Sequence, residues 1–151
     1  MKIGIFIDGL TLYHMVKREQ FDFRKFKEWL IQNNEPTILI YFNSLDNTET
    51  KKPFLNHVYK SGFQLNIRKP LYNKIEKKLI PHGQDTELII QAIHNKDKYD
   101  KFIIITGKHD FVPLCEYLTL QGKVIEIIGL KNSIHNLYEK YPQRHLEEFL
   151  N

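Results

Sequence analysis

Three aspartates stand where segments of predicted regular structure meet, and their carboxylates could bind a cation. Asp8 directly follows the apolar run 3–7, while Asp85 and Asp110 each begin a segment whose apolar residues recur at helical spacing. We therefore expect two of the acids to head the sheet-facing sides of helices. Three carboxylates at one sheet edge would repel one another unless a cation lay between them, and oxygen ligands with retained water favour Mg²⁺ or Mn²⁺.

Each aspartate also has a purely structural interpretation. Asp85 and Asp110 could cap helix N-termini, a contribution of about 1 kcal/mol each, and Asp8 could be a turn residue. For a single acid this interpretation is preferable. All three acids together favour the cation site.

Short apolar runs alternate with amphipathic segments along the whole chain. The apolar runs predict strands over 3–7, 37–42, 102–106 and 124–128, with a weaker strand over 63–67. Helical spacing predicts helices over 23–32, 51–60, 85–95 and 111–121, with helical turns after Asn132 and Arg144. This alternation predicts an α/β fold, a three-layer, doubly wound, mainly parallel sheet with helices on both faces. Functional groups of such sheets gather at the carboxyl ends of the strands.

Length and composition indicate one globular domain and exclude several classes of protein. The 151 residues are 42% hydrophobic and 26% charged, which predicts a single domain over 1–151. The lone Cys115 excludes an internal disulfide, and no spaced Cys and His set predicts a zinc site. Asp8 comes too early for the apolar core of a signal peptide, and no apolar run reaches the length of a membrane span. We expect a cytoplasmic protein without membrane contact.

Positive charge is concentrated in one part of the chain. Residues 51–78 hold eight basic side chains and one acid, a net charge of +7, whereas the other residues hold 14 basic and 17 acidic side chains, a net charge of −3. Clustered cations favour a polyanion such as a nucleic acid, although a solvated lysine-rich surface would have the same composition. Tyr72 adds an aromatic side chain to the basic loop 69–78, which leads directly to Asp85. This adjacency favours nucleic-acid binding.

Three short blocks resemble the signature blocks of the NYN domain, in the LabA-like branch of the PIN-like nuclease superfamily. The blocks are FIDGLTLY over 6–13, HGQDTEL over 82–88 and IIITGKHDFVPL over 103–114. Their order and spacing match the family across essentially the whole chain. The resemblance implies a PIN-like doubly wound domain whose acids bind Mg²⁺ or Mn²⁺ and hydrolyse RNA phosphodiesters. It assigns catalysis and metal binding to Asp8, Asp85 and Asp110.

The chain departs from the family pattern at four positions. Thr11 stands where the first block usually has Asn, His82 where the second has Lys, and Gln91 where another acid is frequent. Lys108 replaces the first Asp of the third block, which changes the local charge by two units. One pair of unit charges about 4 Å apart is worth about 4 kcal/mol at an effective dielectric of 20, so an inward-facing Lys108 would weaken divalent binding.

Two interpretations of Lys108 follow, and the sequence leaves both open. The ammonium could neutralise the acids, leaving an NYN domain that binds RNA or a protein partner without cleavage, or it could hold the scissile phosphate of a metal-dependent ribonuclease. A third interpretation is a phosphoryl-transfer enzyme that acts on a small substrate. We expect RNA as the partner and leave a homodimer open. The residues expected to bind substrate are Thr11, Lys108, Arg68, Lys69, Tyr72 and Lys74.

Overall fold

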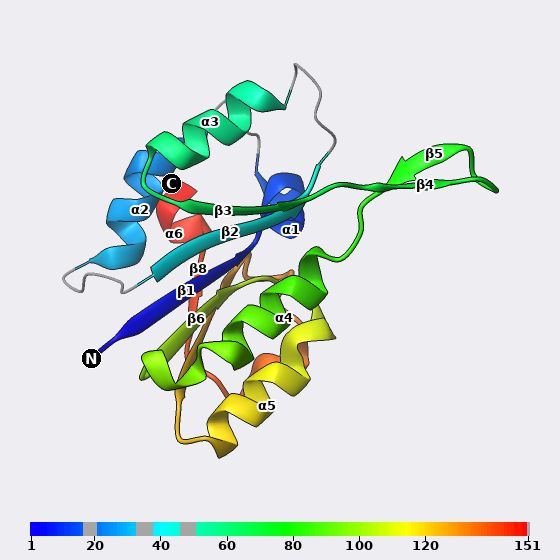
Figure 1. The fold of residues 1–151 in the computed structure, drawn as a ribbon. Helices are drawn as coiled ribbons and strands as arrows, with labels where there is room; N and C mark the ends of the chain where they lie inside the picture. Colours follow the sequence, from blue (N-terminus) through cyan, green and yellow to red (C-terminus); the bar gives the residue numbers. More distant parts are fainter. Residues whose placement is uncertain (17–20, 33–37, 46–50, 151) are drawn as a thin grey trace.

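Parallel strands form the centre of the molecule. The computed structural model describes residues 1–16, 21–32, 38–45 and 51–150, and its main sheet has the order β3-β2-β1-β6-β7-β8 (Figure 1). Every pairing in this sheet is parallel. The strands are β1 (Ile3–Asp8), β2 (Ile38–Ser44), β3 (Gln64–Arg68), β6 (Lys101–Ile105), β7 (Val124–Gly129) and β8 (Gln143–His145).

Helices cover both faces of the sheet, which confirms the predicted three-layer α/β fold. One face carries α1 (Gly9–Met15), α2 (Phe23–Ile31), α3 (Lys52–Lys60) and α6 (Glu147–Leu150), and the other carries α4 (Gln84–His94) and α5 (Val112–Leu120) (Figure 1). Two apolar clusters lie between these layers, one around Phe6, Phe42 and Phe102 and the other around Ile5 and Phe26. Because both faces are covered, the central strands are continuously apolar.

The predicted strands and the four main helices are present, with ends shifted by one or two residues. Thr37, the first residue of one predicted strand, lies outside the described residues, and the strand that follows is β2. The sequence did not predict the short helix α1, the edge strand β8, or a hairpin formed by β4 (Leu71–Asn73) and β5 (Lys78–Ile80).

This hairpin corrects the prediction of a loop over 69–78. The two strands pair antiparallel, with Tyr72 opposite Leu79. The Asn73 carboxamide oxygen accepts hydrogen bonds from the backbone N–H groups of Ile75 and Glu76, at 2.9 and 3.0 Å, which closes the turn. The hairpin projects from the carboxyl edge of the sheet, away from the helical layers (Figure 1).

The strand order reverses between β1 and β6. These strands are neighbours, yet α1 and α2 follow β1 on one face and α5 follows β6 on the other (Figure 1). In doubly wound sheets the crevice outside the carboxyl ends of two such strands is the usual ligand site. The topology therefore indicates a ligand site at Asp8 and the segment after Ile105.

Within the described part of the chain, no helix combines the length and the apolarity needed to cross a lipid bilayer.

Gly9 lets the chain leave β1 and enter α1 without a loop. A Cβ on Gly9 would lie 2.5 Å from the carbonyl oxygen of Phe42 and 2.5 Å from the Tyr41 ring. The backbone of β2 cannot move away without breaking its pairing with β1. A glycine after Asp8 is therefore required by close approach of the two segments.

We predict that Gly9→Ala lowers the free energy of unfolding by about 1–3 kcal/mol, because the added methyl group overpacks against fixed backbone. Chemical denaturation of the variant and wild type measures the difference. Gly122→Ala is the comparison, since Gly122 has open space around its Cα and a φ of +80°, so that only backbone strain of about 1 kcal/mol opposes the methyl group. Equal, small losses in both variants would contradict the close-approach argument.

Candidate functional site

Asp8 is buried at the carboxyl end of β1 and caps helix α1. Its side chain is 1% exposed. Oδ1 accepts a hydrogen bond from the Thr11 N–H at 3.2 Å, and Oδ2 accepts bonds from the Thr11 hydroxyl and, at 2.9 Å, from the Thr106 hydroxyl. The structural interpretation of Asp8 as a turn residue is therefore wrong, because a helix follows directly and Asp8 is its N-cap.

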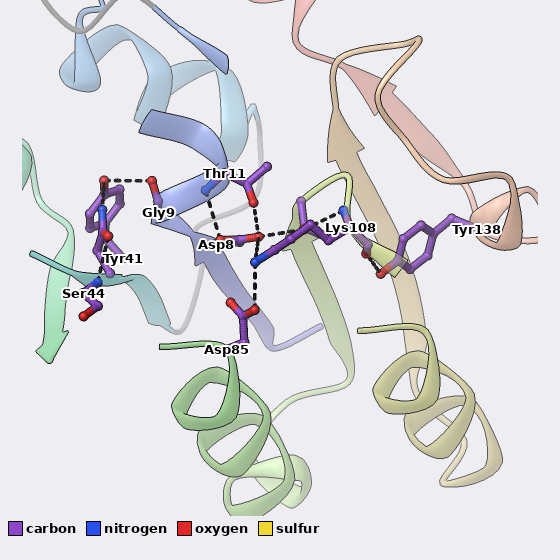
Figure 2. A network of polar contacts seen from close by, with 10 residues as sticks. Asp8, Gly9, Thr11, Tyr41, Ser44, Asp85, Lys108 and Tyr138 are labelled. Carbon is purple, nitrogen blue, oxygen red and sulfur yellow. Dashed lines mark hydrogen bonds and ion pairs between the residues drawn. The ribbon is translucent and has the colours of Figure 1, made fainter. Parts of the chain in front are cut away.

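Lys108 places its ammonium between two of the predicted acids. Its Nζ lies 2.7 Å from Asp85 Oδ2 and 3.6 Å from Asp8 Oδ2 (Figure 2). The backbone of Lys108 is fixed on both sides, because its N–H donates to the Thr106 hydroxyl at 3.1 Å and its carbonyl accepts from the Tyr138 hydroxyl. In the structure the Lys108 side chain faces inward, toward Asp8 and Asp85.

Asp85 lies in the first turn of α4, after Gly83, whose φ of +79° places it in the left-handed region. The N-cap of α4 is Gly83, and no side chain makes a capping hydrogen bond there, so the interpretation of Asp85 as a helix cap is wrong. Its Oδ1 is buried and has no hydrogen-bond partner among the described residues. Burial raises the pKa of Asp85, and the hydrogen bond from Lys108 offsets part of this rise.

A chain of hydrogen bonds links the β1–α1 corner to the segment that carries Asp85. The Tyr41 hydroxyl donates to the Gly9 carbonyl at 3.1 Å and accepts from the Asn43 side chain at 2.8 Å (Figure 2). Asn43 in turn accepts from the Ser44 N–H at 2.7 Å, and the Ser44 hydroxyl accepts from the His82 N–H at 2.9 Å. This network fixes α4 relative to β1 and so sets the separation of the two acids.

Asp110 is exposed, which corrects the prediction that it heads the buried face of its helix. It lies in a 3₁₀ turn over His109–Phe111, and the buried position is taken by Phe111. Its charge still acts on the site, since Asp110 contributes to the raised pKa values of Asp85 and Lys108. Asp110 therefore contributes to the site through its electric field, at longer range than the contacts of Asp8 and Asp85.

The acids do not fit a divalent ion while Lys108 stays in this position. Both oxygens of Asp8 already accept hydrogen bonds, and the ammonium occupies the space where a cation would join Asp8 to Asp85. Across the described ranges, no group of three or more His, Cys, Asp or Glu side chains is arranged to hold a metal ion. Metal binding by Asp8, Asp85 and Asp110 stays a prediction.

The residues expected to bind substrate divide between this site and the hairpin. Thr11 and Lys108 both contact Asp8. Arg68 ends β3 and pairs with Glu87 of α4 at 3.6 Å, which places its guanidinium beside the helix that carries Asp85. The exposed residues Lys69, Tyr72 and Lys74 belong to the hairpin and the segment that leads into it.

Two contributors were missed by sequence reasoning. Thr106 directly follows β6, and its hydroxyl donates to Asp8. Because Asp8 was predicted from its place at the carboxyl end of a strand, the corresponding place of Thr106 could have indicated this residue as well. Tyr138 lies 30 residues from Lys108 along the chain, and no local pattern connects them. Two aromatic residues of the signature blocks differ in burial: Phe111 is fully buried, and Tyr13 packs edge-on against Phe54.

Cys115 is a buried residue of the core. Burial raises the pKa of its thiol to about 12, so the thiolate is scarce at neutral pH.

Comparisons with known proteins agree with this arrangement. A sequence model of the NYN domain family matches residues 2–145. The fold is similar to the crystal structure of VPA0982, a protein of unknown function from Vibrio parahaemolyticus, with a TM-score of 0.79 at 20% identity. The match covers 96% of this chain and 92% of that one. No curated protein matches the chain significantly.

We predict that Lys108→Met raises the pKa of Asp85 further, because it removes the hydrogen bond and the positive charge that favour the carboxylate while desolvation remains. The carboxyl ¹³C shift of Asp85, followed against pH in both proteins, measures the change. In wild type the raised pKa of Asp85 means that the folded state binds the proton more tightly than the unfolded state does. The contribution of Asp85 to the free energy of unfolding therefore falls as the pH rises from 3.8 through the folded-state pKa. An unchanged or lower midpoint in the variant would contradict the pairing.

Proposed function

The chain belongs to the NYN domain family, and from this premise we propose that it binds RNA at the carboxyl edge of its sheet without requiring a divalent cation. NYN domains are part of the PIN-like nuclease superfamily, which supports RNA as the class of ligand. The observation that carries the proposal is the Lys108 ammonium, 2.7 Å from Asp85 and 3.6 Å from Asp8. The site already contains its own cation.

The charge of the site explains why this cation matters for RNA. Asp8, Asp85 and Asp110 carry three negative charges, and the acid typical of the family at position 108 would add a fourth. Lys108 brings the total to −2 instead. Because each pair of unit charges about 4 Å apart is worth about 4 kcal/mol at an effective dielectric of 20, the lysine removes much of the repulsion that a phosphate would meet. In a site with four acids this neutralisation would need a metal ion.

The hairpin supplies groups that attract RNA. Between residues 68 and 78 there are five basic side chains and one acid, Glu76. Tyr72 is 60% exposed and lies opposite the exposed Leu79 on the same hairpin. Lysines neutralise phosphates while an exposed aromatic ring stacks on unpaired bases, a combination typical of single-strand binding. The basic residues are Arg68, Lys69, Lys74, Lys77 and Lys78.

We predict that wild type binds a single-stranded RNA equally well in EDTA and in Mg²⁺, whereas Lys108→Met loses about tenfold in affinity in EDTA and recovers most of it in Mg²⁺. The RNA affinity of the variant falls because the charges of the three acids are no longer compensated. It recovers in Mg²⁺ because the metal ion replaces the ammonium. Fluorescence anisotropy with a labelled oligonucleotide measures both effects.

Tyr72→Ala is the matched comparison, since it should weaken RNA binding by the same factor in both buffers. Wild-type binding that disappears in EDTA would contradict the proposal.

A second candidate is a metal-dependent ribonuclease, which two observations favour. Asp85 Oδ1 is buried without a partner among the described residues, and a buried carboxylate oxygen of this kind is a ready ligand for a cation. Asp110 is exposed close by. In this candidate Asp8, Asp85 and Asp110 would hold Mg²⁺ or Mn²⁺, the ion would supply an activated water, and Lys108 would contact the scissile phosphate instead of the acids.

For this candidate we predict cleavage of mixed RNA by wild type in Mn²⁺, and complete loss of cleavage in Asp85→Asn with the fold retained. If the chain instead binds RNA without cutting it, as first proposed, we predict no cleavage by wild type. We also predict that Lys108→Asp greatly increases the affinity for divalent cations, measured by calorimetry. Circular dichroism of the variants provides the control for folding. Cleavage that persists unchanged in Asp85→Asn would reject the metal assignment.

A further inference from the structure

A cavity of about 480 Å³ opens beside Lys108 at the carboxyl edge of the sheet. Its walls come from the segments that follow β1, β6 and β7: Thr11, His14, Met15, Gly107, Lys108, Leu130 and Ser133. We propose that this cavity binds one nucleobase of the RNA, an inference that rests on the proposed RNA binding and names the contact that selects among bases.

The topology supports a ligand at this place. The lining residues Thr11 and Gly107 follow the carboxyl ends of β1 and β6. The helices after these two strands turn to opposite faces of the sheet (Figure 1). A doubly wound sheet leaves its crevice at this point, because the two following segments diverge. The volume is within the range typical of small-ligand sites.

The walls combine apolar and polar groups in the way that a heteroaromatic ring requires. Met15 and Leu130 pack against the apolar cluster on the α1 and α2 face of the sheet, so their positions are supported from behind. Thr11, His14 and Ser133 add hydroxyl and imidazole groups. A nucleobase has two apolar faces and a polar edge, which such walls can enclose and hydrogen-bond.

Backbone contacts fix the far wall of the cavity. The His135 N–H donates to the Gly107 carbonyl at 3.1 Å, and the Ser133 N–H donates to the Leu130 carbonyl at 2.9 Å. A Cβ on Gly107 would lie only 2.4 Å from the Ser133 carbonyl oxygen, so this close approach requires glycine. The pocket is therefore preformed, which reduces the entropic cost of binding a ligand.

Charge favours a nucleotide over an apolar ligand. Lys108 lines the cavity, and the basic hairpin projects from the same edge of the sheet (Figure 1). A base in the cavity leaves its attached phosphates at the rim, within the field of these cations. An apolar or uncharged ligand would make no use of them.

Nuclear magnetic resonance titration with the four uncharged ribonucleosides, and with ribose as the control, tests the inference. We expect at least one nucleoside to shift the Met15 methyl and Gly107 amide signals, and ribose to leave them unchanged. Ser133→Trp fills the cavity from an exposed position and should weaken this nucleoside about tenfold, the effect of losing one stacked base. Leu120→Trp, at a residue of α5 that is 85% exposed and does not line the cavity, should change nothing.

The outcomes separate the two proposals. If RNA binds but no nucleoside shifts the cavity signals, or ribose shifts them equally, the cavity inference is overturned and the RNA proposal stands. If nucleosides enter the cavity but RNA does not bind, the RNA proposal fails and the cavity is a site for free nucleosides. Retention of nucleoside affinity in Ser133→Trp also overturns the inference.

Discussion

The ion pairs of Lys108 are the interaction on which the site depends. Asp8 is buried, and Asp85 has one buried oxygen without a partner among the described residues, so both carboxylates carry a desolvation penalty that a nearby cation helps to offset. Lys108 supplies this cation from within the chain, and its own pKa is raised by the same acids against the opposing effect of burial. The carboxylates and the ammonium therefore stabilise one another's charged forms.

The sheet brings the partners of this pairing together. β1 and β6 are neighbours in register, so Asp8 at the end of one and Thr106 just past the end of the other face each other. Two residues later the chain has turned enough for Lys108 to reach back over Asp8 toward α4 (Figure 2). Lys108 therefore meets both acids, whereas an acid at this position would add to their repulsion.

The central sheet could be predicted because strands that are buried on both faces consist of continuous apolar runs. Asp8 and Asp85 could be placed because they stand at the ends of predicted elements. Other features lack such a signal. The edge strand β8 consists of Gln143, Arg144 and His145, and is held by pairing with β7 and by the Arg144–Glu126 ion pair. In the hairpin turn, Lys77 has a φ of +54°. A glycine at such a position would have indicated a turn, but the sequence has none there.

Asp110 shows how a correct pattern can give a wrong position. Leu114 and Leu118 follow it at helical spacing, and both are buried as expected. The chain, however, enters α5 through a 3₁₀ turn, which has three residues per turn instead of 3.6, so the phase of the helix does not extend back to Asp110. Phe111 is then the residue turned inward, and Asp110 faces solvent beside the site. The direction of Lys108 was open in the sequence for a related reason, since a loop residue has no period from which its orientation could be deduced.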